Sequence, residues 1–145
     1  MALAEAAGLA VDNGVLVDAT LRTSDPFVYA VGDVANHDHP VLRRRVRVEH
    51  WDTAIEQAKV AARNLLGGQE RYERLPYFFT DQYDLGMEYV GYAAGERSQV
   101  VLRGDPATGP WRAYWLTDEV VAAGMHVNEW GAIDEIREQV GHPLN

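Results

Sequence analysis

A glycine and an aspartate, Gly32 and Asp33, end a run at residues 27–31 that is apolar or aromatic throughout. Such a run is typical of a strand buried on both faces of a parallel or mixed sheet. This strand would place the Asp33 carboxylate at the carboxyl end of the sheet, where open α/β sheets bind ligands, and Gly32 would permit close backbone approach. The carboxylate suits a ligand hydroxyl; the alternative interpretation is a capping or turn aspartate.

A basic cluster follows in a chain that is acidic as a whole. The chain has 13 Lys and Arg against 22 Asp and Glu, a net charge of −9, which argues against a phosphate-binding surface and against a nucleic-acid partner. The cluster is interpreted either as a solvated charged loop or as a local positive patch for an acidic partner. It consists of four arginines just before Glu49-His50-Trp51, namely Arg43, Arg44, Arg45 and Arg47.

Most catalytic signatures are missing from these 145 residues, including the glycine-rich dinucleotide loop, the Walker A motif and the zinc-protease motif. Neither of the two serines, Ser24 and Ser98, lies in a nucleophile-elbow context, so a hydrolase is poorly supported. The absence of cysteine excludes disulfides and thiolate ligands within the chain. His37-Asp38-His39 supplies only part of a metal coordination shell, so we predict no metal site and no catalytic side chain of these kinds.

Composition and hydropathy predict a globular protein. The chain is 47% hydrophobic and 24% charged, as in ordinary globular domains. No apolar run approaches the roughly 20 residues of a membrane-spanning helix, and residues 1–8 lack the features of a signal peptide. We therefore expect a cytoplasmic protein without a membrane partner.

In the first half, turn residues bound two predicted strands at 14–18 and 27–31, and a loop containing His37-Asp38-His39 is expected after Asp33. A helix is predicted over 51–66, because apolar residues recur there at helical spacing. Gly67-Gly68 would end it, and residues 67–74 read as a linker. The predicted apolar stripe of this helix comprises Trp51, Ala54, Ile55, Ala58, Ala61, Ala62 and Leu65.

In the second half, four β-like stretches at 86–93, 99–103, 111–117 and 120–127 are separated by turn residues, and their short connections favour an antiparallel meander. A helix is predicted behind an Asn128 cap, with Trp130, Ile133, Ile136 and Val140 at helical spacing. The aromatic residues Trp111, Tyr114, Trp115 and Trp130 are assigned to the core.

These patterns predict two parts. Residues 75–145 have the pattern of a complete small α+β domain, an antiparallel sheet with a flanking helix. Residues 1–66 read as the closing strands and helix of a larger α/β domain, because two strands and one helix cannot bury both faces of an all-apolar strand.

Three motifs, in order along the chain, carry a family resemblance. The stretch 21–35 resembles the second flavin-binding motif of two-dinucleotide-domain flavoprotein reductases. Glu49-His50-Trp51-Asp52 and the stretch 76–85 narrow this resemblance to ferredoxin reductases of the putidaredoxin reductase type, relatives of the apoptosis-inducing factor flavoproteins. Trp115-Leu116 and the stretch 124–130 are similar to the end of that family's C-terminal domain.

The resemblance implies an FAD site to which this chain contributes part. Asp33 would hydrogen-bond a ribityl hydroxyl of FAD, with Gly32 allowing the approach. Glu49, His50 and Trp51 would lead into the helix beneath the flavin, whose N-terminal end would stabilise negative charge on the reduced ring. Phe79 matches a position, usually tryptophan, where an aromatic side chain lies close to the ring; here the indole N–H is absent. The structural alternatives are a core anchor at Trp51, a capping His50 and interdomain packing at Phe79.

The family's phosphate-binding loop and NAD(P)H unit are not present in these residues. The implied function is a segment of an oxidoreductase that passes electrons from NAD(P)H through FAD to an iron–sulfur ferredoxin, the chain alone being inactive. A homodimer is a possible assembly. The alternative is a non-catalytic module that dimerises or docks a protein partner.

Overall fold

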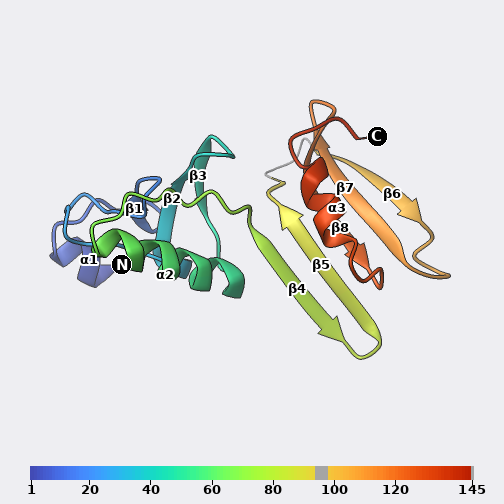
Figure 1. Cartoon of the computed structure of the whole chain (residues 1–145), viewed down its shortest axis with the longest axis horizontal. Helices are drawn as coiled ribbons and strands as arrows, with labels where there is room; N and C mark the ends of the chain where they lie inside the picture. The colour runs from blue at the N-terminus through green and yellow to red at the C-terminus, as the bar shows by residue number, and fades with distance from the viewer. Residues whose placement is uncertain (94–97, 145) are drawn as a thin grey trace. The chain divides into compact units, whose positions relative to one another are not determined.

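A computed structural model describes residues 1–93 and 98–144. The chain divides into two compact units, Met1–Pro76 and Tyr77–Asn145, shown in Figure 1. No helix among the described residues is long and apolar enough to cross a membrane.

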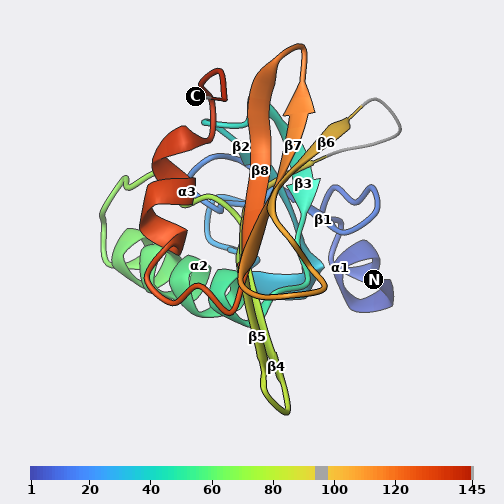
Figure 2. The ribbon, with the colours of Figure 1, turned by 90° about the vertical axis from the view of Figure 1, so that its right-hand side faces the viewer.

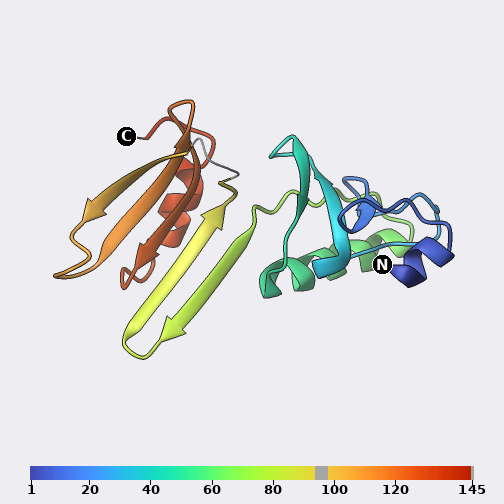
Figure 3. The same ribbon diagram turned by 180° about the vertical axis from the view of Figure 1, so that it is seen from behind.

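The first unit contains a three-stranded sheet whose core residues pack against α2, and Figures 1 and 3 show the helix running beside the sheet. In the sheet order β1-β2-β3, β1 runs parallel to β2 and β2 antiparallel to β3. The elements are α1 (Ala2–Ala6), β1 (Val15–Val17), the 3₁₀ turn η1 (Gly32–Val34), β2 (Ala35–His39), β3 (Arg44–Arg47) and α2 (Trp51–Leu65). The predicted loop after Asp33 is wrong, because β2 and β3 form a hairpin there. Their strands are polar, ANHDH and RRVR, so no apolar alternation marked them.

The predicted buried strand at 27–31 is also wrong. Phe27 is 87% exposed and Val28 is exposed as well, because the turn before them continues into the run. The Phe27 N–H donates to the Asp25 carboxylate at 2.8 Å, and the Val28 N–H donates to the Asp25 carbonyl at 3.1 Å. Residues 29–31 do pack against the core of the unit, and the run pairs only through an isolated antiparallel bridge between Arg22 and Tyr29.

The helix predicted at 51–66 is confirmed as α2, but of the predicted apolar stripe only Ala61 is buried in the core. Trp51 and Leu65 are 72% and 61% exposed, whereas Thr53, Gln57 and Asn64 are buried. Buried polar side chains need hydrogen-bond partners, and Asn64 has them: it donates to the Thr20 carbonyl at 2.9 Å and accepts from the Glu70 N–H at 2.7 Å. Tertiary partners therefore select the buried face of this helix.

Residues 67–74, read as a linker, pack on the first unit. Tyr72 is 3% exposed and belongs to the hydrophobic core, and its N–H donates to the Ala19 carbonyl at 2.9 Å. Two ion pairs join this stretch to α2. Arg63 binds Glu70, and Arg74 binds Asp52 through two bonds of 2.8 and 2.9 Å.

The second unit is a five-stranded antiparallel sheet with α3 on one face, as Figures 1 and 2 show. This confirms the predicted α+β class. The four predicted strands are found, and β4 precedes them; the elements are β4 (Tyr77–Gln82), β5 (Leu85–Gly91), β6 (Gln99–Gly104), β7 (Trp111–Thr117), β8 (Val120–Val127) and α3 (Ile133–Gln139). The order β4-β5-β8-β7-β6 is not a simple meander, because β8 lies between β5 and β7.

The predicted cap and core assignments near α3 need correction. Asn128 does not cap α3; it has a φ of 55°, and its side-chain oxygen accepts the Gly86 N–H at 2.7 Å. Trp130 is 69% exposed, although a side chain at position 86 would meet its ring. Ile136 and Tyr114 are fully buried and meet across Gly124, where a Cβ would lie 2.5 Å from Ile136.

Candidate functional site

The Gly32-Asp33 turn is seated against α2. Gly32 has a φ of +70°, which disfavours any side chain, and a Cβ there would lie 3.2 Å from the Ala54 Cβ. Its buried N–H donates to the Gln57 side-chain oxygen at 2.8 Å. The glycine is therefore needed both for the backbone conformation and for close approach to the helix.

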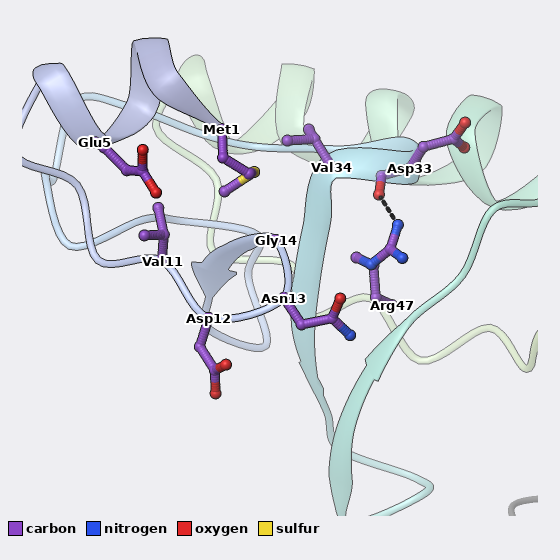
Figure 4. Close-up of a pocket in the computed structure, with 9 residues that line it drawn as sticks. All are labelled: Met1, Glu5, Val11, Asp12, Asn13, Gly14, Asp33, Val34 and Arg47. Atoms are coloured by element: carbon purple, nitrogen blue, oxygen red, sulfur yellow. Dashed lines mark hydrogen bonds between the residues drawn. The ribbon is translucent and has the colours of Figure 1, made fainter.

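The Asp33 carboxylate is left on the exposed side of this turn. Its backbone carbonyl accepts a bond from the Arg47 guanidinium at 3.1 Å, and Figure 4 shows the carboxylate pointing away from the other labelled residues. The side chain is thus available as an acceptor for a ligand hydroxyl. Beside the turn lies a hollow of about 420 Å³ lined by Met1, Glu5, Val11, Asp12, Asn13, Gly14, Asp33, Val34 and Arg47.

His50 and Trp51 lie at the N-terminal end of α2. His50 is its N-cap residue, and the His50 carbonyl accepts the Ala54 N–H at 3.1 Å. Burial lowers the pKa of His50, while the carboxylates of Asp52 and Asp33 act in the opposite direction. Asp33, His50 and the start of α2 are therefore close together, and Trp51 presents an exposed indole there. The N–H groups of a helix's first turn and its dipole favour negative charge.

The four arginines have different roles. Arg45 donates to the Val17 carbonyl at 3.1 Å and to the Asn36 carbonyl at 2.8 Å. Arg47 pairs with Glu49 and holds the Asp33 carbonyl. The remaining two, Arg43 and Arg44, are exposed at the β2–β3 turn, where Arg43 has a φ of 52°. Half of the predicted basic patch is therefore built into the framework of the first unit.

Phe79 belongs to the second unit. It lies on β4 opposite Glu88, is 51% exposed, and has its ring 6.4 Å from that of Tyr77. The structure thus brings Gly32, Asp33, Glu49, His50 and Trp51 to one end of the first unit and keeps Phe79 as an exposed aromatic side chain of the other.

The His37-Asp38-His39 segment carries side chains of the types that bind metal ions. Across residues 1–93 and 98–144, no group of three or more His, Cys, Asp or Glu side chains is placed to hold a metal ion. Both histidines are buried instead, at 1% exposure each.

Gln57 is the site residue that sequence reasoning missed. It lies one helical turn beyond Thr53 on the polar face of α2, and nothing in the local pattern distinguishes it from a solvent-exposed glutamine. Its contact with Gly32 joins residues 25 positions apart. Such a contact is set by the tertiary fold.

We expect Gln57→Leu to destabilise the first unit by about 1–3 kcal/mol, because it leaves the buried Gly32 N–H without an acceptor. Chemical denaturation followed by amide exchange of α2 measures this loss. Ala58→Leu is the matched control, since position 58 is exposed, and its free energy of unfolding should change by less than about 0.5 kcal/mol. Equal stabilities of the Gln57 variant and the parent would contradict this role of Gln57.

Comparison with known proteins connects this geometry to a family. Residues 1–58 match the family model described as pyridine nucleotide-disulphide oxidoreductase, and residues 77–142 match the one described as reductase C-terminal. The anthranilate 1,2-dioxygenase system ferredoxin–NAD(+) reductase component of Burkholderia cepacia is 47% identical over 128 residues, 87% of this chain and 31% of that protein. Putidaredoxin reductase of Pseudomonas putida is 39% identical over 126 residues, 87% of this chain and 30% of that protein. Over most of its length, this chain is similar to the C-terminal part of putidaredoxin reductase-type reductases.

The solved structures agree with this assignment. The crystal structure of the covalent putidaredoxin reductase–putidaredoxin complex matches with a TM-score of 0.86 and 36% identity, covering 94% of this chain and 33% of that one. The chain spans about a third of the length of the reductases it matches. Its similarity covers their C-terminal part, as the resemblance implied.

Proposed function

We propose that this chain forms part of a flavoprotein oxidoreductase that passes electrons from NAD(P)H through FAD to an iron–sulfur ferredoxin. The observation that carries the proposal is the Gly32-Asp33 turn, whose exposed carboxylate lies beside the N-terminal end of α2. The similarity to ferredoxin reductases over 87% of the chain supports it.

The residues present fit the sugar and ring portions of FAD. Asp33 would accept a ribityl hydroxyl hydrogen bond, because its carboxylate is exposed while its backbone is held by Arg47. Gly32 keeps that turn close to α2 and leaves no Cβ in the way. FAD held by these residues would supply hydride acceptance from NAD(P)H and one-electron release to the ferredoxin.

The N-terminal end of α2 would contribute electrostatics. Its dipole and first-turn N–H groups would favour negative charge on the flavin ring, while His50, with a lowered pKa, adds no fixed positive charge at neutral pH. Glu49 is paired with Arg47, so we assign it to holding the turn. Trp51 and Phe79 would supply apolar surface to the ring through their exposed aromatic side chains.

A chimera tests the proposal. Residues 1–145 replace the matching segment of the Burkholderia cepacia reductase, and FAD content and NADH-dependent ferredoxin reduction are measured. We expect near-stoichiometric FAD in the chimera and none in the isolated chain, because the isolated chain has no glycine-rich pyrophosphate loop. A folded chimera without flavin would favour the docking-module alternative.

Within the chimera, Asp33→Ala should lower FAD affinity about tenfold or more, because a charge-assisted hydrogen bond contributes roughly 1.5–3 kcal/mol. Asp38→Ala is the matched control, since Asp38 is an exposed aspartate five positions later in the same unit. Equal FAD affinities for the two variants would remove the proposed role of Asp33.

We further propose that Arg43 and Arg44 attract an acidic ferredoxin. Replacing both with serine in the chimera should slow association with ferredoxin by roughly tenfold at low ionic strength. The difference should shrink as salt approaches about 0.15 M, where the Debye length is about 8 Å. Stopped-flow reduction of the ferredoxin measures this, and NADH-to-FAD reduction should be unchanged.

Arg45 is left in place in this experiment because its bonds to two backbone carbonyls make it structural. Arg71→Ser is the net-charge control for each single variant, Arg43→Ser and Arg44→Ser, since Arg71 is an exposed arginine of the same unit. A salt-independent defect, or none at low salt, would contradict the docking role of Arg43 and Arg44.

A further inference from the structure

A buried histidine cluster, which the proposed function does not use, lies beneath the stretch that leads into the second unit. His37 and His39 lie on the same side of β2, each 1% exposed. Tyr72 meets both rings edge-on, with centroid distances of 5.4 Å to His37 and 6.2 Å to His39. We call these three residues the histidine latch.

His39 is held in its neutral form by geometry. Its Nδ1 accepts the N–H groups of Val41 and Leu42, each at 3.3 Å. Its Nε2 must then carry the proton that is donated to the Arg74 carbonyl at 3.1 Å. A second proton on Nδ1 would face two N–H donors. Protonation would therefore break either the β2–β3 turn or the contact with residue 74.

His37 is held neutral by burial. Neither of its ring nitrogens makes a hydrogen bond of good geometry among residues 1–93 and 98–144. Burial lowers the pKa of His37 to about 4, assisted by electrostatic interactions with His39 and Arg45, while the Asp38 carboxylate and the Ala19 carbonyl act in the opposite direction. A charged imidazole without adequate partners is costly in such a place.

Residues 69–76, which cover His37 and His39, are joined to the rest of the first unit by a small set of hydrogen bonds and ion pairs. The Tyr72 N–H donates to the Ala19 carbonyl, and Glu70 is bound to Asn64. The ion pairs of Arg63 with Glu70 and Arg74 with Asp52 are partly exposed, and exposed pairs contribute little. The charged and titratable groups around the two histidines are Asp38, Arg45, Asp52, Tyr72, Glu73 and Arg74.

We propose that the histidine latch is a proton-sensitive fastening, which holds residues 69–76 on the first unit at neutral pH and releases them under mildly acidic conditions. Opening exposes both imidazoles to water, where they bind protons readily. Because the pKa of His37 is lower in the closed form, the open form binds more protons between about pH 6.5 and pH 4. The closed form therefore loses stability as the pH falls through that window.

The test is amide hydrogen exchange by NMR on the full chain, expressed as protection factors from about pH 7.5 to pH 5. The protection factor of the Tyr72 amide should fall roughly thirtyfold over this range. A fall of this size is expected when the pKa of one histidine rises from about 4 to 6.5 on opening. Amides within α2 and the Tyr92 amide, bonded to the Ala122 carbonyl of the second unit, should keep theirs. An equal loss at all three places would mean global unfolding and would overturn the latch.

Variants distinguish a loss of Tyr72 protection that requires His37 and His39 from a general loss of stability in acid. His37→Phe combined with His39→Asn removes both titrating groups and keeps an acceptor for the β2–β3 turn, so Tyr72 protection should become independent of pH. His142→Gln is the matched control, because His142 is exposed, and it should behave as wild type. A double variant that loses Tyr72 protection with pH as wild type does would overturn the proposal.

The wild-type chain gives a second measurement in case the double variant does not fold. The ring carbon resonances of His37 should titrate well below pH 6.5 and those of His39 below their ordinary range, and Tyr72 protection should fall as the pH decreases from 6.5. Histidines that titrate near pH 6.5 while the Tyr72 amide stays protected would contradict the proposal.

Discussion

Replacing Gly91 with alanine is expected to destabilise the second unit by about 3 kcal/mol or more. Gly91 has a φ of +105°, and a Cβ there would lie 2.5 Å from the Ala122 carbonyl oxygen and 2.7 Å from the Ala123 Cα. Both contacts are to the backbone of β8, which cannot move aside without breaking its pairing with β5. Backbone strain and steric overlap therefore add.

Urea denaturation followed by tryptophan fluorescence measures this effect. In a Trp51→Phe background the remaining tryptophans, Trp111, Trp115 and Trp130, all report on the second unit. Gly109→Ala is the control, because a Cβ at that position would meet no atom within 4 Å, and its stability should stay within about 1 kcal/mol of the parent. A Gly91 variant as stable as the Gly109 variant would show that β5 and β8 are not packed as described.

The second large effect is expected from Tyr72→Ala. It should lower the free energy of unfolding of the first unit by about 3–5 kcal/mol, as when other buried aromatic side chains are truncated to alanine. Tyr72 is 3% exposed and packs with Val17, Leu21 and Val60 in the core. Its removal also uncovers His37 and His39. The prediction is independent of the latch, because it concerns packing at neutral pH.

Amide exchange of β2 and α2 at neutral pH reports the loss in the Tyr72 variant, and the second unit should retain its protection. Leu66→Ala provides the comparison, since Leu66 is 90% exposed and lies six positions earlier in the chain. Retained protection in the Tyr72→Ala variant would show that residues 67–76 act as a free linker.

Some residues of the candidate site can be predicted from local sequence and others cannot. Gly32, Asp33 and the segment Glu49-His50-Trp51 were predicted from motif resemblance, and the structure places them at one end of the first unit. Their roles remain proposals. Gln57 and Arg47, which hold the turn, could not be predicted, because each contact joins residues far apart in sequence.

The contacts of the four arginines could not be predicted from local sequence either. Four similar side chains in five positions looked equivalent, yet Arg45 and Arg47 donate hydrogen bonds to backbone carbonyls of residues 9 to 28 positions away. These contacts arise from the pairing of β2 with β3. Both strands are polar, so the sequence shows no alternation of apolar residues that would predict them.

The sequence alone indicated the family resemblance, the α2 helix, four strands of the second sheet and the α+β class, since these depend on motifs and on periodicity within single elements. Only the tertiary structure decided which faces and segments are buried. It buried Thr53, Gln57 and Asn64 of α2, exposed Phe27 and Trp130, covered the two histidines with Tyr72, and placed β8 between β5 and β7. The physical reason is that periodicity records the amphipathic character of an element, whereas burial depends on which distant residues supply surface and hydrogen bonds to it.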